Sequence, residues 1–190
     1  MEVEKTSLED CLIIRNNVFD DDRGFFLESF NKKKFQELTG VDFDVKQINF
    51  AKSQKQVLRG LHYQLAPYAQ GKLVGVIQGA VLDVVVDLRK NSSTFGQSFS
   101  FCINQPNLCM YVPRGFAHGY KVLEDDTLFY YGVDNFYAPQ HERGVAYNDP
   151  SIQVDWIDEK NIISNKDLEH PLLRDAEINF DIEGNSIHNQ

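Results

Sequence analysis

KLVGVIQGAVLDVVVDL, residues 72–88, is the stretch of sequence that decides the fold. Two runs rich in β-branched residues, 72–77 and 81–88, flank the dipeptide Gln78-Gly79, which is typical of a turn. Because both runs are short and meet at a turn, the pattern predicts two successive β-strands.

Further strands are predicted on the C-terminal side of this stretch. Residues 97–103 alternate polar and apolar side chains, as a half-buried strand does. Residues 104–107 (NQPN) form a predicted turn, after which 108–112 run extended up to Pro113-Arg114-Gly115. The segment TLFYYGVD at 127–134 is again strand-like. Short strands at this spacing predict an all-β sandwich or barrel.

Two short helices are predicted beside the strands. The first covers residues 32–38, with Asn31 as its N-cap, Gly40 at its end, and Phe35 and Leu38 facing inward. A second helix is predicted to start at Ser164. No strand alternates with a long helix, and there is no G-x-G-x-x-G or P-loop sequence, so a Rossmann fold is not expected.

Composition restricts the class of protein. With 190 residues, no repeat and no Pro/Ser-rich linker, the chain is predicted to form one domain, residues 1–190. A net charge of −9 argues against a nucleic-acid or anionic-membrane surface. No signal peptide or transmembrane run is visible, and three cysteines without C-x-x-C spacing fit reduced thiols. A cytoplasmic protein is therefore expected.

Two histidines lie in suggestive settings. His118 ends the sequence PRGFAH at 113–118, and this P-x-G-x-x-H spacing is used near a metal by many cupin jelly-roll proteins. Those proteins also carry H-x-H and a nearby Glu, whereas this chain has His62-Tyr63-Gln64 and no Glu between Gln64 and Glu124. Two imidazoles without a carboxylate make a poor divalent-metal site, so no metal and no cofactor are expected. His141 and His170 are predicted to be surface residues.

A histidine without a metal can act as a base near neutral pH. Removing a proton beside a ketone requires a positive charge or hydrogen-bond donors near the enolate oxygen. Lys72 and Arg59 are candidates for that charge, and Tyr131 could return a proton on the opposite face. On the residues alone, the alternative stays open that His62 and Tyr131 are ordinary structural side chains.

At this point the chain resembles a known family, the dTDP-4-dehydrorhamnose 3,5-epimerases, from about residue 12 to about residue 173. The matching motifs come in the right order along the chain: DRGFFLE at 22–28, QIN at 47–49, VLRGLHYQ at 57–64, QGKLV at 70–74, VVVDLR at 84–89, PRGFAHG at 113–119, NFYAP at 135–139, ERG at 142–144, NDP at 148–150 and VDW at 154–156. The predicted core is therefore about 12–173, with a C-terminal tail at 174–190.

The resemblance implies a cupin jelly roll (a double-stranded β-helix) with a few short helices, active as a homodimer. The implied substrate is dTDP-4-dehydro-6-deoxy-D-glucose, whose C3 and C5 are inverted to give dTDP-4-dehydro-L-rhamnose. Such an isomerase acts in L-rhamnose biosynthesis for cell-surface polysaccharides. A C3-only or C5-only epimerase, a 3,4-ketoisomerase on a related dTDP-4-keto-6-deoxysugar, and a sugar-nucleotide-binding module without catalysis remain as alternatives.

The resemblance also assigns roles to residues. It implies that His62 is the base, Asp167 its orienting carboxylate, Tyr131 the proton donor, and Lys72 the group near the enolate oxygen. Ser164 with an acid three residues later also fits a helix capping box, so both interpretations of Asp167 stand. The implied substrate-binding residues are Arg23, Phe26, Glu28, Gln47, Asn49, Arg59, His118, Tyr137, Glu142 and Lys166, with Tyr137 stacking on thymine.

Two departures from the family pattern bear on regiospecificity. Gly75 stands where an Arg is common, and Gly132 stands where a Lys often follows the donor tyrosine. Both flank a proposed catalytic residue, so they are expected to affect how the sugar ring sits. No second His–carboxylate pair is apparent in the sequence, which favours one base used at both carbons.

Overall fold

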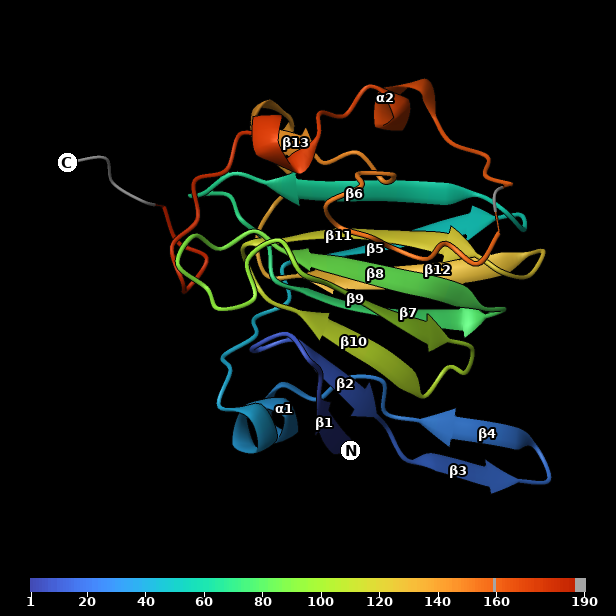
Figure 1. The fold of residues 1–190 in the computed structure, drawn as a ribbon. Coiled ribbons are helices and arrows are strands. Elements are labelled where there is room, and N and C mark those ends of the chain that lie inside the picture. The colour runs from blue at the N-terminus through green and yellow to red at the C-terminus, as the bar shows by residue number, and fades with distance from the viewer. Residues whose placement is uncertain (159, 187–190) are drawn as a thin grey trace.

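The computed structural model describes residues 1–158 and 160–186, and its longer strands form two facing β-sheets (Figure 1). The larger sheet has six strands in the spatial order β1 (Glu2–Lys5), β2 (Leu12–Arg15), β10 (Leu108–Val112), β7 (Lys72–Gln78), β12 (Thr127–Val133) and β5 (Gln47–Ser53). The smaller sheet has five, in the order β13 (Glu142–Gly144), β6 (Leu58–Gln64), β11 (Phe116–Val122), β8 (Val81–Asp87) and β9 (Ser98–Ile103).

The remaining elements are short. Strands β3 (Val18–Asp21) and β4 (Gly24–Leu27) form a separate hairpin that projects from the body of the chain (Figure 1). The helical segments are α1 (Lys32–Thr39), η1 (Pro139–His141), α2 (Asn165–Leu168) and η2 (Leu173–Asp175). Antiparallel strands that pass repeatedly from one sheet to the other make this a jelly roll, so the predicted all-β fold class is confirmed.

The five strands predicted from the sequence are present as β7, β8, β9, β10 and β12, with bounds within one residue of those expected. The position of strand β8 explains why apolar residues follow one another directly in its sequence. Val81 and Val85 pack between the two sheets, whereas Leu82 and Val84 pack under the C-terminal segment. Since successive side chains of a strand point to opposite faces, a strand covered on both faces shows no alternation. Asp83 shares the inner face and lies beside His118, which lines the cavity described below.

Helix α1 has the predicted caps. Oδ1 of Asn31 accepts a hydrogen bond from the Lys34 amide, and Gly40 ends the helix in the left-handed conformation, at φ 76°. Phe35 is buried, as expected, but the prediction that Leu38 faces inward is wrong, because its side chain is 53% exposed. The aromatic cluster under the helix closes around Phe35 alone, through Phe30, Phe43 and Tyr111.

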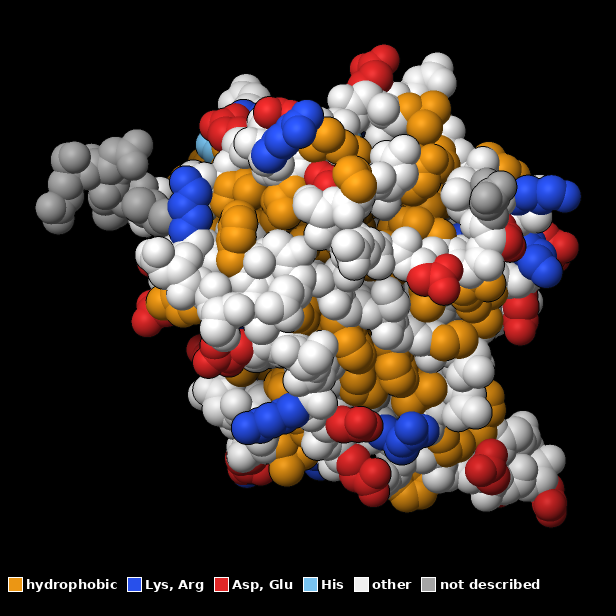
Figure 2. All heavy atoms as spheres, viewed as in Figure 1, with side chains coloured by type: hydrophobic (Ala, Val, Ile, Leu, Met, Phe, Trp, Pro, Cys, Tyr) orange, Lys and Arg blue, Asp and Glu red, His pale blue; other side chains and the backbone are white. Residues whose placement is uncertain are grey.

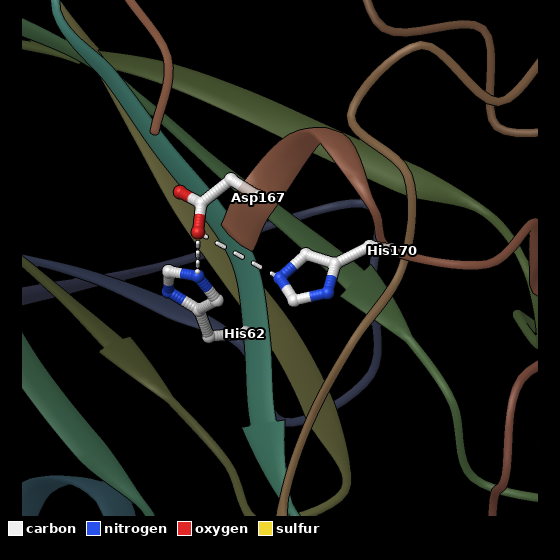
Figure 3. A group of neighbouring side chains, drawn as sticks. All are labelled: His62, Asp167 and His170. Atoms are coloured by element: carbon white, nitrogen blue, oxygen red, sulfur yellow. Dashed lines mark hydrogen bonds and ion pairs between the residues drawn. The ribbon is translucent and has the colours of Figure 1, made fainter. Parts of the chain in front are cut away.

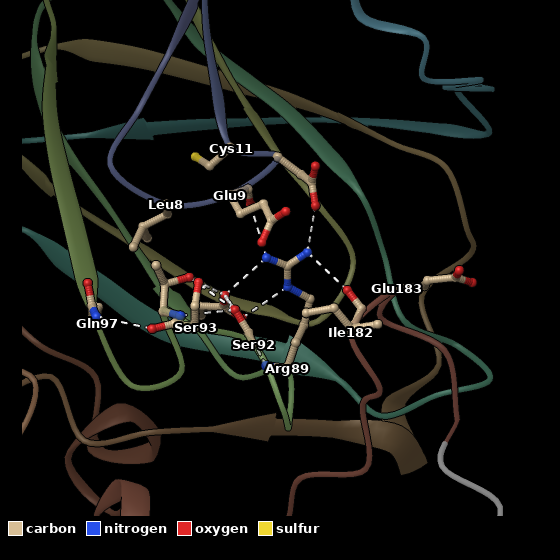
Figure 4. A network of polar contacts seen from close by, with 12 residues as sticks. Leu8, Glu9, Cys11, Arg89, Ser92, Ser93, Gln97, Ile182 and Glu183 are labelled. Atoms are coloured by element: carbon tan, nitrogen blue, oxygen red, sulfur yellow. Dashed lines mark hydrogen bonds and ion pairs between the residues drawn. The ribbon is translucent and has the colours of Figure 1, made fainter.

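The two ends of the chain are tied together by a buried arginine (Figure 4). Arg89 makes a two-point ion pair with Asp87, and its remaining N–H groups donate to Asp10 Oδ2 and to the carbonyl oxygens of Glu9 and Ile182. All five guanidinium donors therefore have an acceptor. The network fixes the N-terminal loop and the C-terminal segment against the end of β8.

Two features lie outside residues 12–173. Strand β1 pairs with β2, and Phe180 is fully buried against the outer face of the smaller sheet.

The three cysteines are free thiols. Among the described residues, no helix is long and apolar enough to cross a membrane. Acidic and basic side chains are interspersed over the face seen in Figure 2.

Candidate active site

A cavity of about 670 Å³ opens between the two sheets. His62 and His118 line it from β6 and β11 of the smaller sheet, whereas Lys72 and Tyr131 line it from β7 and β12 of the larger sheet. Alternate residues of a strand point to the same face. Val74 and Phe129 point into the space between the sheets, so Lys72 and Tyr131, each two residues away, point there too. The cavity thus brings together groups from four strands that are far apart in the sequence.

His62 is held by Asp167 (Figure 3). Nε2 of the imidazole lies 2.9 Å from Oδ1 of Asp167, whose Oδ2 accepts a hydrogen bond from the Gly60 amide at 3.0 Å. Nδ1 of His62 has no hydrogen-bond partner among residues 1–158 and 160–186, and the side chain is 31% exposed to the cavity. The ring is therefore oriented by one nitrogen and free to react at the other.

Helix α2 places this carboxylate. As predicted, Ser164 is the N-cap, and its Oγ accepts a hydrogen bond from the Asp167 amide at 3.2 Å. The two interpretations of Asp167 are compatible, because its backbone completes the cap while its side chain turns toward His62. Burial opposes ionisation of Asp167, but hydrogen bonds from His62 and Gly60 outweigh burial and lower its pKa to about 2. Asp167 is thus a carboxylate at neutral pH.

Lys72 is a buried amine at the floor of the cavity. Its side chain is 8% exposed, and its Nζ has no hydrogen-bond partner within the described part of the chain. Burial lowers the pKa of Lys72 to about 8, while Asp83 and Glu142 act in the opposite direction. The group is poised to be cationic near neutral pH and to meet a negative charge inside the cavity.

His118 has a carboxylate of its own, which was not predicted from the sequence. Its Nε2 lies 3.0 and 2.9 Å from the two oxygens of Asp83, a fully buried residue of β8. Burial lowers the pKa of His118 and raises that of Asp83. The expectation that the chain has no second His–carboxylate pair is therefore wrong, because β8 and β11 are adjacent strands that bring Asp83 beside His118.

Tyr131 faces the smaller sheet from the opposite wall. Burial raises the pKa of its phenol, and the nearby guanidinium of Arg59 partly offsets this effect. Arg59 donates to Ser53 Oγ at 3.2 Å and lines the same cavity. The phenol thus keeps its proton at neutral pH and can act as an acid.

Polar residues surround the cavity mouth. Glu142 accepts hydrogen bonds from the Tyr137 hydroxyl at 2.7 Å and from Lys166 Nζ at 2.6 Å. On β5, Gln47 donates to Asn49 at 2.9 Å, and its Oε1 accepts from the Tyr137 amide. These contacts hold the exposed ring of Tyr137 at the entrance, where a flat ligand group can stack on it.

Comparison with known proteins places these residues in a family. The sequence profile described as dTDP-4-dehydrorhamnose 3,5-epimerase matches residues 5–175. The chain belongs to this epimerase family. It is 47% identical over 178 residues to the dTDP-4-dehydrorhamnose 3,5-epimerase of Shigella flexneri, which covers 93% of this chain and 98% of that protein.

Solved structures agree with this assignment. The dTDP-6-deoxy-D-glucose-3,5-epimerase of Legionella pneumophila, solved in complex with dTDP-4-keto-L-rhamnose, superposes with a TM-score of 0.87 at 41% identity, covering 91% of this chain and 93% of that one. A 3′-monoepimerase of Streptomyces bikiniensis, solved in complex with dTDP-quinovose, gives a TM-score of 0.84 at 33% identity, with coverage of 89% and 86%. Proteins named for double and for single epimerisation thus share this fold.

The two departures from the family pattern do not face the cavity. A Cβ on Gly75 would lie 2.9 Å from the ring of Tyr130, and a Cβ on Gly132 would lie 3.3 Å from Val45, both on the outer side of the larger sheet. Lys72 and Tyr131 point the other way. The structure therefore gives no basis for expecting these glycines to contact the sugar ring and change its position in the cavity.

Three of the predicted substrate-binding residues lie away from the cavity within one chain. Arg23, Phe26 and Glu28 belong to the β3–β4 hairpin and the residues after it, and none lines the cavity. Arg23 pairs with Asp21, whereas Glu28 pairs with Lys34 at 2.7 Å. The ring of Phe26 is one of the most exposed apolar groups on the hairpin.

His170 is not the surface residue that was predicted. Its side chain is only 11% exposed, and its Nε2 lies 3.8 Å from Asp167 Oδ1 (Figure 3). The residues after α2 turn back toward β6, which a sequence in polar surroundings does not reveal. His62, Asp167 and His170 together offer three ligand atoms within 4.8 Å of one another, so the expectation of no metal stays a prediction. His141 is half-buried, with its ring 4.4 Å from that of Tyr68.

Proposed function

We propose that this chain inverts C3 and C5 of dTDP-4-dehydro-6-deoxy-D-glucose through enolate intermediates. The observation that carries the proposal is the arrangement across the cavity, with the His62–Asp167 pair on one wall and Tyr131 and Lys72 on the other. Inversion requires a base on one face of a carbon and an acid on the opposite face. The names of the related epimerases support the choice of sugar nucleotide.

In the first step, Nδ1 of His62 takes the proton from the carbon beside the C4 ketone. The C–H electron pair forms the enolate, whose negative oxygen is stabilised by the ammonium of Lys72. Asp167 stabilises the resulting imidazolium, because the carboxylate keeps its charge at neutral pH. In the second step, the Tyr131 hydroxyl gives its proton to the other face of the carbon, and proton exchange with solvent restores both groups.

The same groups can serve both carbons. C3 and C5 flank one carbonyl, so one oxyanion site stabilises either enolate, and the sugar need only turn to present its second proton. His118 is less suited to act as the second base, because its side chain is 7% exposed and its Nε2 is held by buried Asp83. We assign His118 and Arg59 to substrate binding, with Gln47, Asn49, Tyr137, Glu142 and Lys166 nearer the entrance.

We also propose a homodimer in which the β3–β4 hairpin reaches the partner's cavity. The outer face of the larger sheet exposes Ile48 and Phe50, at 59% and 61%, and the hairpin exposes Phe19, Phe25 and Phe26. Large exposed apolar side chains on a sheet face and on a projecting hairpin are typical of an interface. Light scattering should give twice the 21.8 kDa mass of one chain, and Phe50→Asp should weaken the dimer. A wild-type mass near that of a single chain would contradict the proposal.

Proton NMR on the 4-keto sugar nucleotide in deuterated water tests the reaction class. An epimerase replaces protons next to the carbonyl with deuterium while the carbonyl stays at C4. Movement of the carbonyl to C3 would instead identify a ketoisomerase, and an unchanged spectrum would identify a binding module. Either of the last two results would overturn the proposed function.

A further inference from the structure

The group formed by His62, Asp167 and His170 has a feature that the proposed reaction does not use. Nε2 of His170 is buried and has no hydrogen-bond partner among the residues that the structure describes, although a buried polar atom usually has one. It lies 3.8 Å from Asp167 Oδ1, and the two histidine rings meet edge to face with centroids 5.4 Å apart (Figure 3). A lone pair or an N–H of His170 is thus aimed at the catalytic pair without a bond to satisfy it.

The neighbouring strand leaves room for this ring. Gly144 of β13 lies against His170, and a Cβ at that position would overlap the imidazole. The ring is therefore enclosed between β13 and the His62–Asp167 pair, with little freedom to turn its Nε2 toward solvent. An enclosed nitrogen that faces a carboxylate is a pre-positioned ligand.

We propose that His62, Asp167 and His170 bind a divalent transition-metal cation, for which Zn²⁺ is the natural probe, and that this cation inhibits the enzyme. Two imidazole nitrogens and one carboxylate oxygen are a common zinc ligand set, with a fourth position left for water. The donor atoms lie 2.9 and 3.8 Å from Asp167 Oδ1 and all within 4.8 Å of one another. Tetrahedral zinc with bonds of about 2.0–2.1 Å needs donors roughly 3.4 Å apart, so the donors that are furthest apart must approach by up to about 1.4 Å, roughly 0.7 Å from each side.

The inhibition follows from the chemistry of the ring. A neutral imidazole has one N–H and one lone pair. If the lone pair of Nε2 binds zinc, the proton of His62 must sit on Nδ1, which then cannot accept a proton from a substrate. The metal also takes the carboxylate that would stabilise the imidazolium. Metal binding and proton abstraction at His62 are therefore mutually exclusive.

Zinc titration of the full-length protein, by calorimetry and by competition with a chromophoric chelator, tests binding without any substrate. We expect one zinc per chain and an affinity at least about tenfold weaker in His170→Gln, since a ligand is lost. His141→Gln is the matched control, because His141 lies outside the group, and it should bind as the wild type does. Equal affinity of the wild type and His170→Gln, or no stoichiometric binding, would overturn the proposal.

A second measurement does not depend on the folding of any variant. Wild-type crystals soaked in zinc should show anomalous density at the zinc edge between the three donor atoms, and density only elsewhere would contradict the site. The test of inhibition rests on the proposed function, because it measures the epimerase reaction. Zinc should stop deuterium uptake by the substrate, and a chelator should restore it. Zinc binding by a protein without epimerase activity would defeat the proposed function alone, whereas an active enzyme unaffected by zinc would defeat this inference alone.

Discussion

Nε2 of His62 lies 2.9 Å from Oδ1 of Asp167, a residue 105 positions further along the chain. The contact exists because helix α2 packs against β6, where the Gly60 amide binds the other carboxylate oxygen. The carboxylate thus fixes the ring, and its low pKa keeps it charged beside any imidazolium that forms. This relationship is the basis of several expectations for variants of the protein.

Asp167→Asn should lower kcat by about 10²-fold or more and change KM little. The amide keeps the size of the side chain but cannot stabilise the imidazolium, and acid–base groups typically contribute about 10²–10⁴-fold. Steady-state kinetics measure the effect. Asp175→Asn, an exposed acid in η2, is the control and should behave as the wild type. Similar kinetics for both variants would show that Asp167 only caps the helix.

The alkaline limb of kcat/KM should report Lys72. Burial lowers the pKa of this amine to about 8, and Asp83, Glu142 and His118 are the ionisable groups around it. The protonated amine is the active form, so kcat/KM should be level below pH 8 on this limb and fall about tenfold per unit above it. The Lys72→Arg variant keeps its positive charge above pH 8. Its kcat/KM should therefore be lower than that of the wild type but should not fall with pH on this limb. A limb that persists unchanged in Lys72→Arg would assign it to another group.

His118→Gln should slow the reaction but leave deuterium entering both C3 and C5. The reason is that His118 is closely surrounded by the protein and paired with Asp83, whereas Nδ1 of His62 is open to the cavity. Position-resolved NMR in deuterated water separates the two carbons. Loss of exchange at one carbon only would mean that the two histidines each serve one carbon as base.

Arg89→Met should lower the free energy of unfolding by about 3–5 kcal/mol, because it leaves Asp87 buried without its cation. Urea unfolding followed by the fluorescence of Trp156, the single tryptophan, measures this change. Arg174→Met, at an exposed site, should stay within about 0.5 kcal/mol of the wild type. Since Arg89 does not line the cavity, kcat per folded molecule should be unchanged; equal stability of the two variants would refute the role of the network.

Strands covered on both faces could be predicted from the sequence, because a run such as 81–88 is dominated by valine and leucine. Strands β6 and β11 could not, since the cavity requires polar residues on one face of each. His62 and Gln64 interrupt the apolar pattern of β6, as His118 does in β11. The polar residues that form the site therefore also break the hydrophobicity pattern by which its strands could be recognised.

The sequence motifs identified the residues that line the cavity but not all of their partners. An acid inside a run of valines is a signal for a buried carboxylate that needs a partner, and Asp83 could have been recognised in this way. His170 carried no such signal, because only the turn after α2 brings it to Asp167. The predicted contacts of the β3–β4 hairpin depend on a second chain, which one sequence cannot position.

The central claim is that one base, His62, abstracts the protons at both carbons. Its most direct test is deuterium uptake at C3 and C5 in deuterated water, measured for the wild type, His62→Ala and Tyr131→Phe. We expect uptake at both carbons in the wild type, none in His62→Ala, and partial uptake in Tyr131→Phe, since the tyrosine acts only after the proton has left. Uptake at one carbon only in the wild type, or near wild-type uptake in His62→Ala, would contradict the account.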